Sequence, residues 1–181
     1  MTSWVALLRG VNVGGHRRVP MATLRTVFES LGHANVVTYI ASGNVVFDSP
    51  KRATRALADE LEIAILEEFG FEVDVVVRSA AEMATVVAQN PFRKASAIPK
   101  ELLYAAFPAQ PIAGTDLSID RSFAPDEFSV GRFAIYLHRP AGFSQPTKLT
   151  DAFLSKVAGS PVTTRNWNTV AKLAELARGR T

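Results

Sequence analysis

The chain has 181 residues, of which 48% are apolar and 20% are charged, and its formal net charge is +3. This composition is typical of a globular protein with a real core, and it excludes a collagen-like, coiled-coil or largely disordered chain. Because the chain contains no cysteine, disulfides, thiolate metal sites and cysteine nucleophiles are excluded as well.

The first half of the chain predicts elements in the order β-α-β-β-α-β, followed by one further helix. Residues 4–9 form an apolar run with the length of a strand buried on both faces. That run is too short for a signal peptide or a membrane span, and no later segment is long enough, so we expect a cytoplasmic protein without a membrane partner. The other predicted segments are a helix over 20–32, a hairpin over 36–48, a helix over 49–70, a strand over 73–77 and a capped helix over 79–89.

The second half repeats this order. Its segments are a strand over 102–107, a weak helix or irregular crossover over 111–119, a hairpin over 127–137, a helix over 149–159, a strand over 161–164 and a last helix that Asn168 can cap. We therefore predict an α+β fold of two tandem ferredoxin-like (β-α-β-β-α-β) units, each with an extra helix. The predicted lobes are 1–92 and 93–181, divided in the polar segment 91–100, and we expect them to form one compact unit.

The strongest candidate site is the glycine-rich loop after the first strand. Its candidate ligand-binding residues are Arg9, Asn12, Gly14, Gly15, His16 and Arg17. Glycines permit close approach of a ligand, and the helix that begins at Pro20 adds free N–H groups, so the loop suits a phosphate or carboxylate. The spacing matches neither a P-loop nor the dinucleotide fingerprint. A plain connector with a solvated basic tip explains the same residues equally well.

A second candidate region is the turn of the first hairpin, Ser42-Gly43-Asn44. Gly43 and Asn44 are both able to adopt positive φ there. Simple turn chemistry explains this triplet better than a serine nucleophile does, because the sequence shows no neighbouring base or oxyanion pocket. Asn44 is kept as a possible contributor to the site.

The third region is Arg165-Asn166-Trp167-Asn168 near the end of the chain. Arg165 offers a planar guanidinium for a carboxylate or phosphate, and Asn166 offers a donor and an acceptor. Asn168 and Trp167 are explained more simply as a helix cap and a core residue. We expect the glycine-rich loop, Asn44, Arg165 and Asn166 to surround one common hollow.

Three hypotheses about function stay open. The preferred one is a binding protein for a small molecule or anion, with no cofactor. The second is an enzyme acting on a phosphorylated or carboxylated metabolite, with His16 as acid or base and Arg9 or Arg165 holding the anion. The third is a nucleic-acid-binding module, which is the least favoured because the aromatic signature of RNA-binding sheets is missing.

The three histidines lack metal-site spacing, so no metal is expected. Oligomeric state and a purely structural or protein-binding role are left open.

Four stretches of the chain carry a resemblance to a known family. They are 6–15 (ALLRGVNVGG), 39–47 (around SGNVV), 90–92 (NPF) and 164–170 (TRNWNTV). In this order they resemble the bacterial family of uncharacterised proteins catalogued as domain of unknown function 1697. The resemblance implies a two-lobed ferredoxin-like fold and implies no activity. The segment 142–149 is longer than this family leads us to expect, which leaves any role of that loop open.

Overall fold

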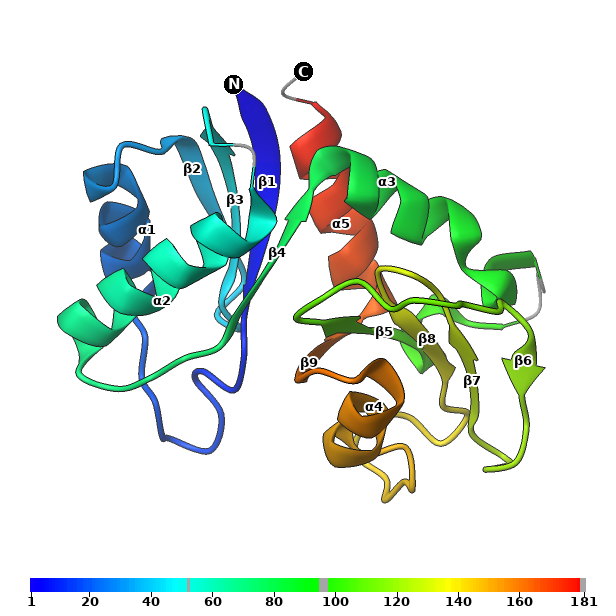
Figure 1. The fold of residues 1–181 in the computed structure, drawn as a ribbon. Helices are drawn as coiled ribbons and strands as arrows, with labels where there is room; N and C mark the ends of the chain where they lie inside the picture. Colours follow the sequence, from blue (N-terminus) through cyan, green and yellow to red (C-terminus); the bar gives the residue numbers. More distant parts are fainter. Residues whose placement is uncertain (52, 95–97, 180–181) are drawn as a thin grey trace. The chain divides into compact units, whose positions relative to one another are not determined.

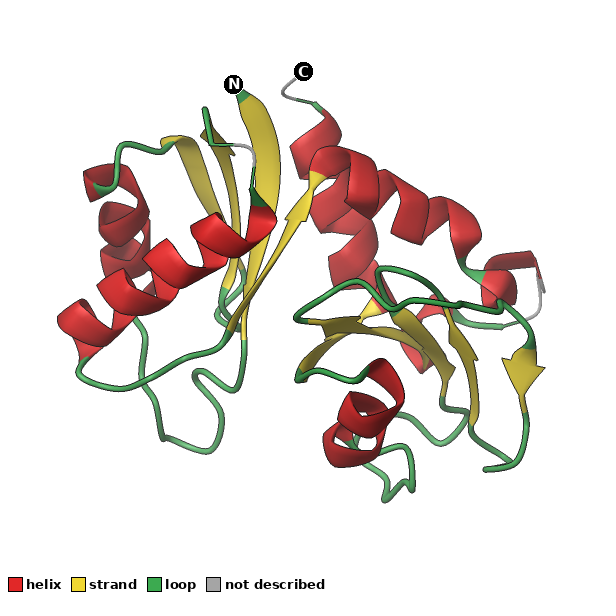
Figure 2. Ribbon diagram, viewed as in Figure 1, coloured by secondary structure: helices red, strands yellow, loops and turns green. Residues whose placement is uncertain are grey.

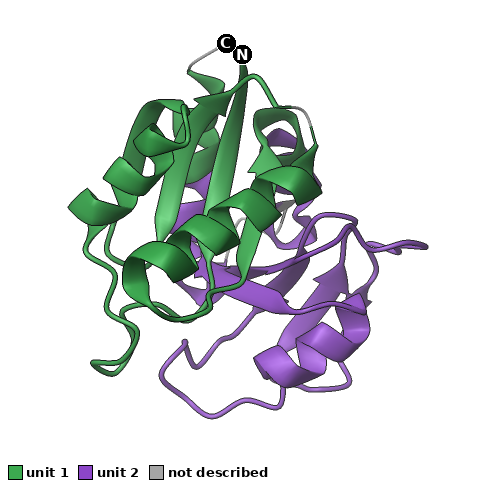
Figure 3. Ribbon diagram, turned by 60° about the vertical axis from the view of Figure 1, so that its left-hand side comes forward, with its two compact units in different colours: residues 1–83, 173–181 green, residues 84–172 purple. Residues whose placement is uncertain are grey.

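The structure, a computed structural model, describes residues 1–51, 53–94 and 98–179. This described part is mixed α+β, with five α-helices, two 3-10 helices and nine strands in two antiparallel sheets (Figure 1, Figure 2). The chain divides into unit 1, residues 1–83 and 173–181, and unit 2, residues 84–172 (Figure 3). The predicted boundary between residues 92 and 93 falls inside unit 2 in this division, and residues 95–97 of the predicted linker lie outside the described residues.

Unit 1 holds the first sheet, whose strand order is β2-β3-β1-β4. Its elements are β1 (Thr2–Leu8), α1 (Met21–Ser30), β2 (Ala34–Tyr39), β3 (Asn44–Ser49), α2 (Thr54–Phe69) and β4 (Val75–Ser79). The central strand β1 pairs antiparallel with both β3 and β4. Helices α1 and α2 lie on the same face of the sheet (Figure 1). This arrangement leaves the loop between β1 and α1 at one end of the central strand.

The apolar run of β1 explains why this strand is central. Trp4, Ala6 and Leu8 belong to the core beneath the two helices. The intervening Val5 and Leu7 are also buried, as the alternation of side chains on a strand requires when both faces are covered. The prediction of a strand buried on both faces is confirmed.

Three helix boundaries in unit 1 show which interactions determine where a helix begins or ends. Helix α2 begins at Thr54, five residues after the predicted start, because Ser49 still belongs to β3 and pairs with Thr2. It ends at Gly70, whose φ of 77° is the left-handed conformation that favours glycine at this position. The capping box predicted for α3 (Ala80–Gln89) is present, since Ser79 N donates to Glu82 Oε2 at 2.8 Å and Glu82 N donates to Ser79 Oγ at 3.2 Å.

Unit 2 holds the second sheet, whose strand order is β6-β7-β8-β5-β9. Its elements are η1 (Pro91–Lys94), η2 (Lys100–Leu102), β5 (Leu103–Pro108), β6 (Ile119–Asp120), β7 (Glu127–Val130), β8 (Ile135–His138), α4 (Asp151–Ala158), β9 (Val162–Asn166) and the start of α5 (Trp167–Arg178). Leu154 of α4 packs on one face of this sheet. Within the same unit, Tyr136 of β8 donates a hydrogen bond to Val86 O at 3.0 Å and meets Trp167 edge to face.

The crossover over 111–119 contains no helix. Of the two structures predicted for this segment, a weak helix and an irregular crossover, the irregular crossover is the one observed. Gly114 adopts a φ of 63°. Asp116 Oδ1 accepts a hydrogen bond from Ser118 N at 2.9 Å. An aspartate that bonds to the backbone two residues ahead favours a turn over a helix. The segment ends in the short strand β6, which adds a fifth strand to the sheet edge.

The last helix is capped by a different asparagine from the one predicted. Asn166 Oδ1 accepts a hydrogen bond from Asn168 N at 2.9 Å. Asn166 therefore holds the N-cap position directly before α5, because an N-cap oxygen accepts from the second or third residue after it. Asn168 lies inside the first turn of the helix.

The 142–149 loop is held by two buried anchors of unit 2. Arg139 Nη2 donates to Gln145 O at 2.7 Å, and its guanidinium lies 5.2 Å from the centroid of the Phe143 ring. Further along, Thr147 donates a hydrogen bond to Asp126. The loop thus has a fixed course over the end of β8, which gives it a structural role.

Among the described residues, no helix combines the length and the apolar character that crossing a membrane demands.

Candidate functional site

The candidate site begins with a small hairpin in the loop between β1 and α1. Val13 and His16 form an isolated antiparallel bridge, in which His16 N donates to Val13 O at 3.2 Å. Gly14 and Gly15 make the turn, with φ of 61° and 77°. A two-residue hairpin turn with positive φ at both positions favours glycine. The tip of this loop, residues 13–18, is exposed.

Asn12 fixes the base of the loop. Its side-chain amide donates to Val19 O at 2.9 Å and to Ala41 O at 2.6 Å, while its Oδ1 accepts from Val19 N at 2.8 Å. Asn12 also takes a positive φ of 56°, which asparagine tolerates better than most residues. Because the side chain is fully used within the protein, Asn12 is a positioning residue for the loop and not a free ligand donor.

The exposed tip is basic. His16, Arg17 and Arg18 follow the glycine turn and are all exposed. Arg9, at the base of the loop, is engaged with Asp74: its Nη1 lies 3.0 Å from Asp74 Oδ2, with side chains 38% and 56% exposed. Exposed pairs of this kind contribute about 0–1 kcal/mol and can exchange partners. Within the part of the chain that the structure describes, neither Arg17 nor Arg18 forms an ion pair, so the loop presents two accessible guanidinium groups, and a competing anion can recruit a third, that of Arg9.

Asn44 supports the hairpin turn beside the loop. It is completely buried, and its amide donates to Tyr39 O at 3.0 Å and Ser42 Oγ at 3.1 Å. Of the two residues predicted to take positive φ, Gly43 does (φ 76°), whereas Asn44 starts β3 and Ile40 takes the second positive φ. Asn44 is a structural residue of the turn.

Arg165 and Asn166 belong to unit 2. Arg165 lies on β9 and is nine-tenths buried, and its Nη1 donates to Thr163 Oγ1 at 2.8 Å and Thr164 O at 3.0 Å. Burial lowers the pKa of the Arg165 guanidinium to about 10, although the nearby Asp151 carboxylate acts in the opposite direction. Asn166, besides capping α5, donates to Glu101 O at 3.2 Å.

The structure thus gathers six of the nine candidate residues on one loop of unit 1 and places Asn44 in the neighbouring turn, linked through the bond from Asn12 to Ala41. Arg165 and Asn166 lie in the other unit, so a hollow shared by all nine stays a prediction. A pocket of about 430 Å³ in unit 1 is lined by α2 and by residues 72–74, and none of the nine residues lines it.

Sequence reasoning missed a polar pair in unit 2. Glu127 and His138 face each other across β7 and β8, with His138 Nδ1 2.9 Å from Glu127 Oε2. Arg121 Nε lies 2.6 Å from the other carboxylate oxygen. The hydrogen bond with His138, together with Arg121, lowers the pKa of Glu127. The predicted hairpin over 127–137 could not find the pair, because its two ends are residues 127 and 137, whereas the observed register pairs Glu127 with His138 and Phe128 with Leu137. Among the described residues, no group of three or more potential metal ligands gathers.

Comparison with known proteins places the chain in a family. The profile of a family described as "Protein of unknown function (DUF1697)" matches residues 1–136. The chain belongs to this family. The match includes three of the four stretches that carry the sequence resemblance, whereas 164–170 lies beyond it.

A similar fold occurs in a solved structure, that of the conserved bacterial protein SP0830 from Streptococcus pneumoniae. The TM-score is 0.70 and the identity 22%, over 97% of this chain and 98% of the other. At that identity the likeness concerns the fold alone. No curated protein matches the chain.

Proposed function

We propose that this DUF1697 protein binds a small anion, a phosphate or a carboxylate, at the tip of the 11–19 loop. The observation that carries the proposal is the row of exposed basic side chains, His16, Arg17 and Arg18, along this loop. Asn12 holds the base of the loop, because its amide donates to Val19 O and Ala41 O and accepts from Val19 N. A loop whose base is already held by hydrogen bonds loses less entropy when a ligand binds.

The chemistry of the tip suits an oxyanion. Guanidinium groups donate paired hydrogen bonds to carboxylate and phosphate oxygens, and such charge-assisted bonds are about twice as strong as neutral ones. The exposed backbone of Gly14 and Gly15 allows a ligand to approach closely, because neither residue carries a Cβ and nothing lies within 4 Å of where one would be. In this proposal Asn12 and Asn44 support the loop, and Arg9 is a secondary contact.

The proposal is tested by thermal denaturation in the presence of inorganic phosphate and of citrate, against sodium chloride at equal ionic strength. A ligand that binds only the native state raises the melting temperature progressively with its concentration. We expect this rise in the parent chain, and its loss in the double variant Arg17→Ala/Arg18→Ala. Arg25→Ala on α1 is the matched control, since Arg25 is also an exposed arginine of unit 1. An equal rise in the double variant and in the control would refute a site at the tip.

The enzyme hypothesis gains no specific support. It requires a second titratable group beside His16, and in the described part of the chain no carboxylate forms an ion pair with that exposed histidine. The nucleic-acid hypothesis likewise has no observation of its own.

We also propose that both units are variants of the ferredoxin-like unit. The order β2-β3-β1-β4 in unit 1, with β1 antiparallel to both neighbours, supports this assignment. In unit 2 the strands β7-β8-β5-β9 repeat the order, but the first crossover has no helix and β6 is added. An experimental structure with another strand order, or with β1 or β5 parallel to a neighbouring strand, would contradict the assignment.

A further inference from the structure

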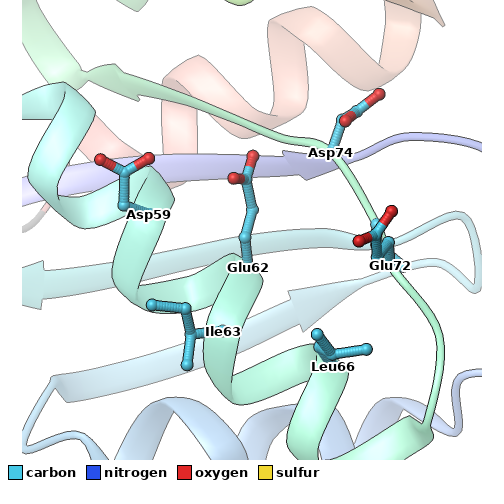
Figure 4. Close-up of a pocket in the computed structure, with 7 residues that line it drawn as sticks. Asp59, Glu62, Ile63, Leu66, Glu72 and Asp74 are labelled. Atoms are coloured by element: carbon cyan, nitrogen blue, oxygen red, sulfur yellow. The ribbon is translucent and has the colours of Figure 1, made fainter.

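We propose that a groove beside α2 receives the tip of the 11–19 loop from a second copy of this chain. The α2 groove is the pocket of about 430 Å³ in unit 1 (Figure 4), and its lining includes Asp59, Glu62, Ile63, Leu66, Glu72 and Asp74. The inference goes beyond anion binding and does not depend on it, although it uses the same loop.

The first observation is a pair of exposed apolar side chains in the groove. Ile63 is 59% exposed and Leu66 41% exposed, although both are large and apolar. They lie three residues apart and so are neighbours on the helix surface, whereas Leu61 and Ile65 of the same helix are completely buried. The two side chains form a small apolar patch bordered by carboxylates, which a partner with its own apolar group would cover.

The second observation is the charge of the rim. Asp59 and Glu62 come from α2, and Glu72 and Asp74 come from the segment that leads into β4 (Figure 4). Glu62 accepts a hydrogen bond from Val75 N at 2.9 Å, which ties the two sides of the groove together. This acidic rim occurs in a chain whose formal net charge is +3.

The rim carboxylates are available for exchange. Asp59 pairs with Arg55 at 2.7 Å and Asp74 pairs with Arg9 at 3.0 Å, and in both pairs each side chain is more than a third exposed. Such pairs contribute little to stability, so an incoming cation can replace them at low cost. The groove therefore favours a ligand that carries an apolar group beside positive charge.

The chain itself contains a segment with this chemistry. Val13 at the tip of the 11–19 loop is 68% exposed, and the basic residues His16, Arg17 and Arg18 follow it in exposed positions. An apolar residue followed by two arginine cations complements Ile63 and Leu66 inside an acidic rim. This match identifies the occupant as a second copy, because no other partner is needed to supply the complementary surface.

The position of the loop makes the contact reciprocal. Arg9 N donates to Asp74 O at 3.0 Å, so the loop leaves β1 next to a residue that lines the groove. The base of the loop is bonded through Asn12 to Ala41 in the β2–β3 turn and not to α2. Two copies related by a two-fold axis can each place a loop in the other's groove, which gives a closed dimer with two equal contacts.

The test is sedimentation velocity over a concentration series, with the full chain and three variants. We expect the parent chain to dimerise with rising concentration. Leu66→Glu disables the groove and Arg17→Glu/Arg18→Glu disables the loop, so each raises the dimer dissociation constant by more than about tenfold. Leu117→Glu, which places the same charge on an exposed leucine of unit 2, is the matched control and leaves dimerisation unchanged.

A mixture of the groove variant and the loop variant gives the sharper result. A heterodimer of the two keeps one intact loop facing one intact groove, so the mixture is expected to dimerise more tightly than either variant alone. A parent chain that is monomeric at every concentration overturns the inference, and so does a mixture no tighter than its components. Leu66→Glu is expected to keep the phosphate-induced rise in melting temperature, so a failure of the dimer is distinguishable from a failure of anion binding.

Discussion

Asn12 shows how one side chain can determine the shape of a loop. Three hydrogen bonds join its amide to Val19 and Ala41. Asn12→Ala removes all three and places alanine at a positive φ, so we expect the free energy of unfolding to fall by about 1–3 kcal/mol in urea denaturation.

Asn12→Asp provides the matched comparison. Aspartate keeps the acceptor for Val19 N and tolerates positive φ, but it cannot donate to Val19 O or Ala41 O. Its second carboxylate oxygen would face the carbonyl oxygens of Val19 and Ala41, so its loss of stability should be at least as large as that of Asn12→Ala. If Asn12→Ala is as stable as the parent, Asn12 does not hold the loop.

His33 makes the stability of unit 1 depend on pH. Its ring is buried, with its centroid 4.8 Å from that of Phe47, and its Nε2 lies 3.6 Å from Glu60 Oε2. Burial lowers the pKa of His33 from its ordinary value, outweighing the opposing effect of Glu60. Because the unfolded chain then binds the proton more tightly than the native one, the stability contributed by neutral His33 is present above about pH 6.5 and is lost as the pH falls below it.

The measurement is urea denaturation of the parent and of His33→Phe at a series of pH values below about 7. We expect the parent to lose stability faster than His33→Phe as the pH falls. His16→Ala, which removes an exposed histidine, should keep the pH dependence of the parent. Parallel curves for the parent and His33→Phe would show that His33 is not the group responsible.

At the level of elements, the start of α5 gives a clear prediction. Asn166 accepts the capping bond from Asn168 N, so Asn166→Ala should lower the free energy of unfolding by about 0.5–2 kcal/mol. Asn168→Ala should be close to neutral, because that residue lies inside the helix, where alanine is favourable. The two variants are compared by thermal denaturation. A larger loss of stability in Asn168→Ala than in Asn166→Ala would identify Asn168 as the capping residue.

The same elements show which features a sequence can predict. Local signals located the capping box at Ser79 and Glu82, the hairpin around Gly43 and the helix end at Gly70, because each depends on residues a few positions apart. The start of α2 and the cap of α5 were misplaced because long-range pairing decides them. Ser49 is held in β3 by Thr2, and β9 continues to Asn166 through its pairing with Tyr104.

The candidate site divides in the same way. Its glycine turn and basic tip follow from the local sequence. The use of the Asn12 amide depends on Ala41, which lies 29 residues away, and the pairing of Arg9 depends on Asp74, 65 residues away. Neither partner could be identified from local patterns.

For the whole molecule, the division into two units predicts which of the two tryptophans reports the stability lost through a core substitution. The two tryptophans are buried, Trp4 in unit 1 and Trp167 in unit 2. Leu173 is completely buried and belongs to unit 1 although it follows unit 2 in the chain. We expect Leu173→Ala to lower the stability reported by Trp4 by about 2–5 kcal/mol.

The test uses single-tryptophan chains, with Trp4→Phe or Trp167→Phe, and fluorescence during urea unfolding. Leu154→Ala is the control, since it creates a comparable cavity in unit 2. Leu173→Ala should shift the Trp4 transition at least as much as the Trp167 transition, and Leu154→Ala should do the reverse. A shift caused by Leu173→Ala that only Trp167 senses would contradict the assignment of Leu173.

The assignment of residues after 172 to unit 1 has a consequence for synthesis. A ribosome produces residues 1–83 first, yet Leu173 and Ala177, which are buried in the finished protein, emerge only after all of residues 84–172. During translation, residues 1–83 therefore cannot complete the core of unit 1 until residues 84–172 have been synthesised. A pause late in the message would prolong this interval and give a chaperone more time to bind the nascent chain.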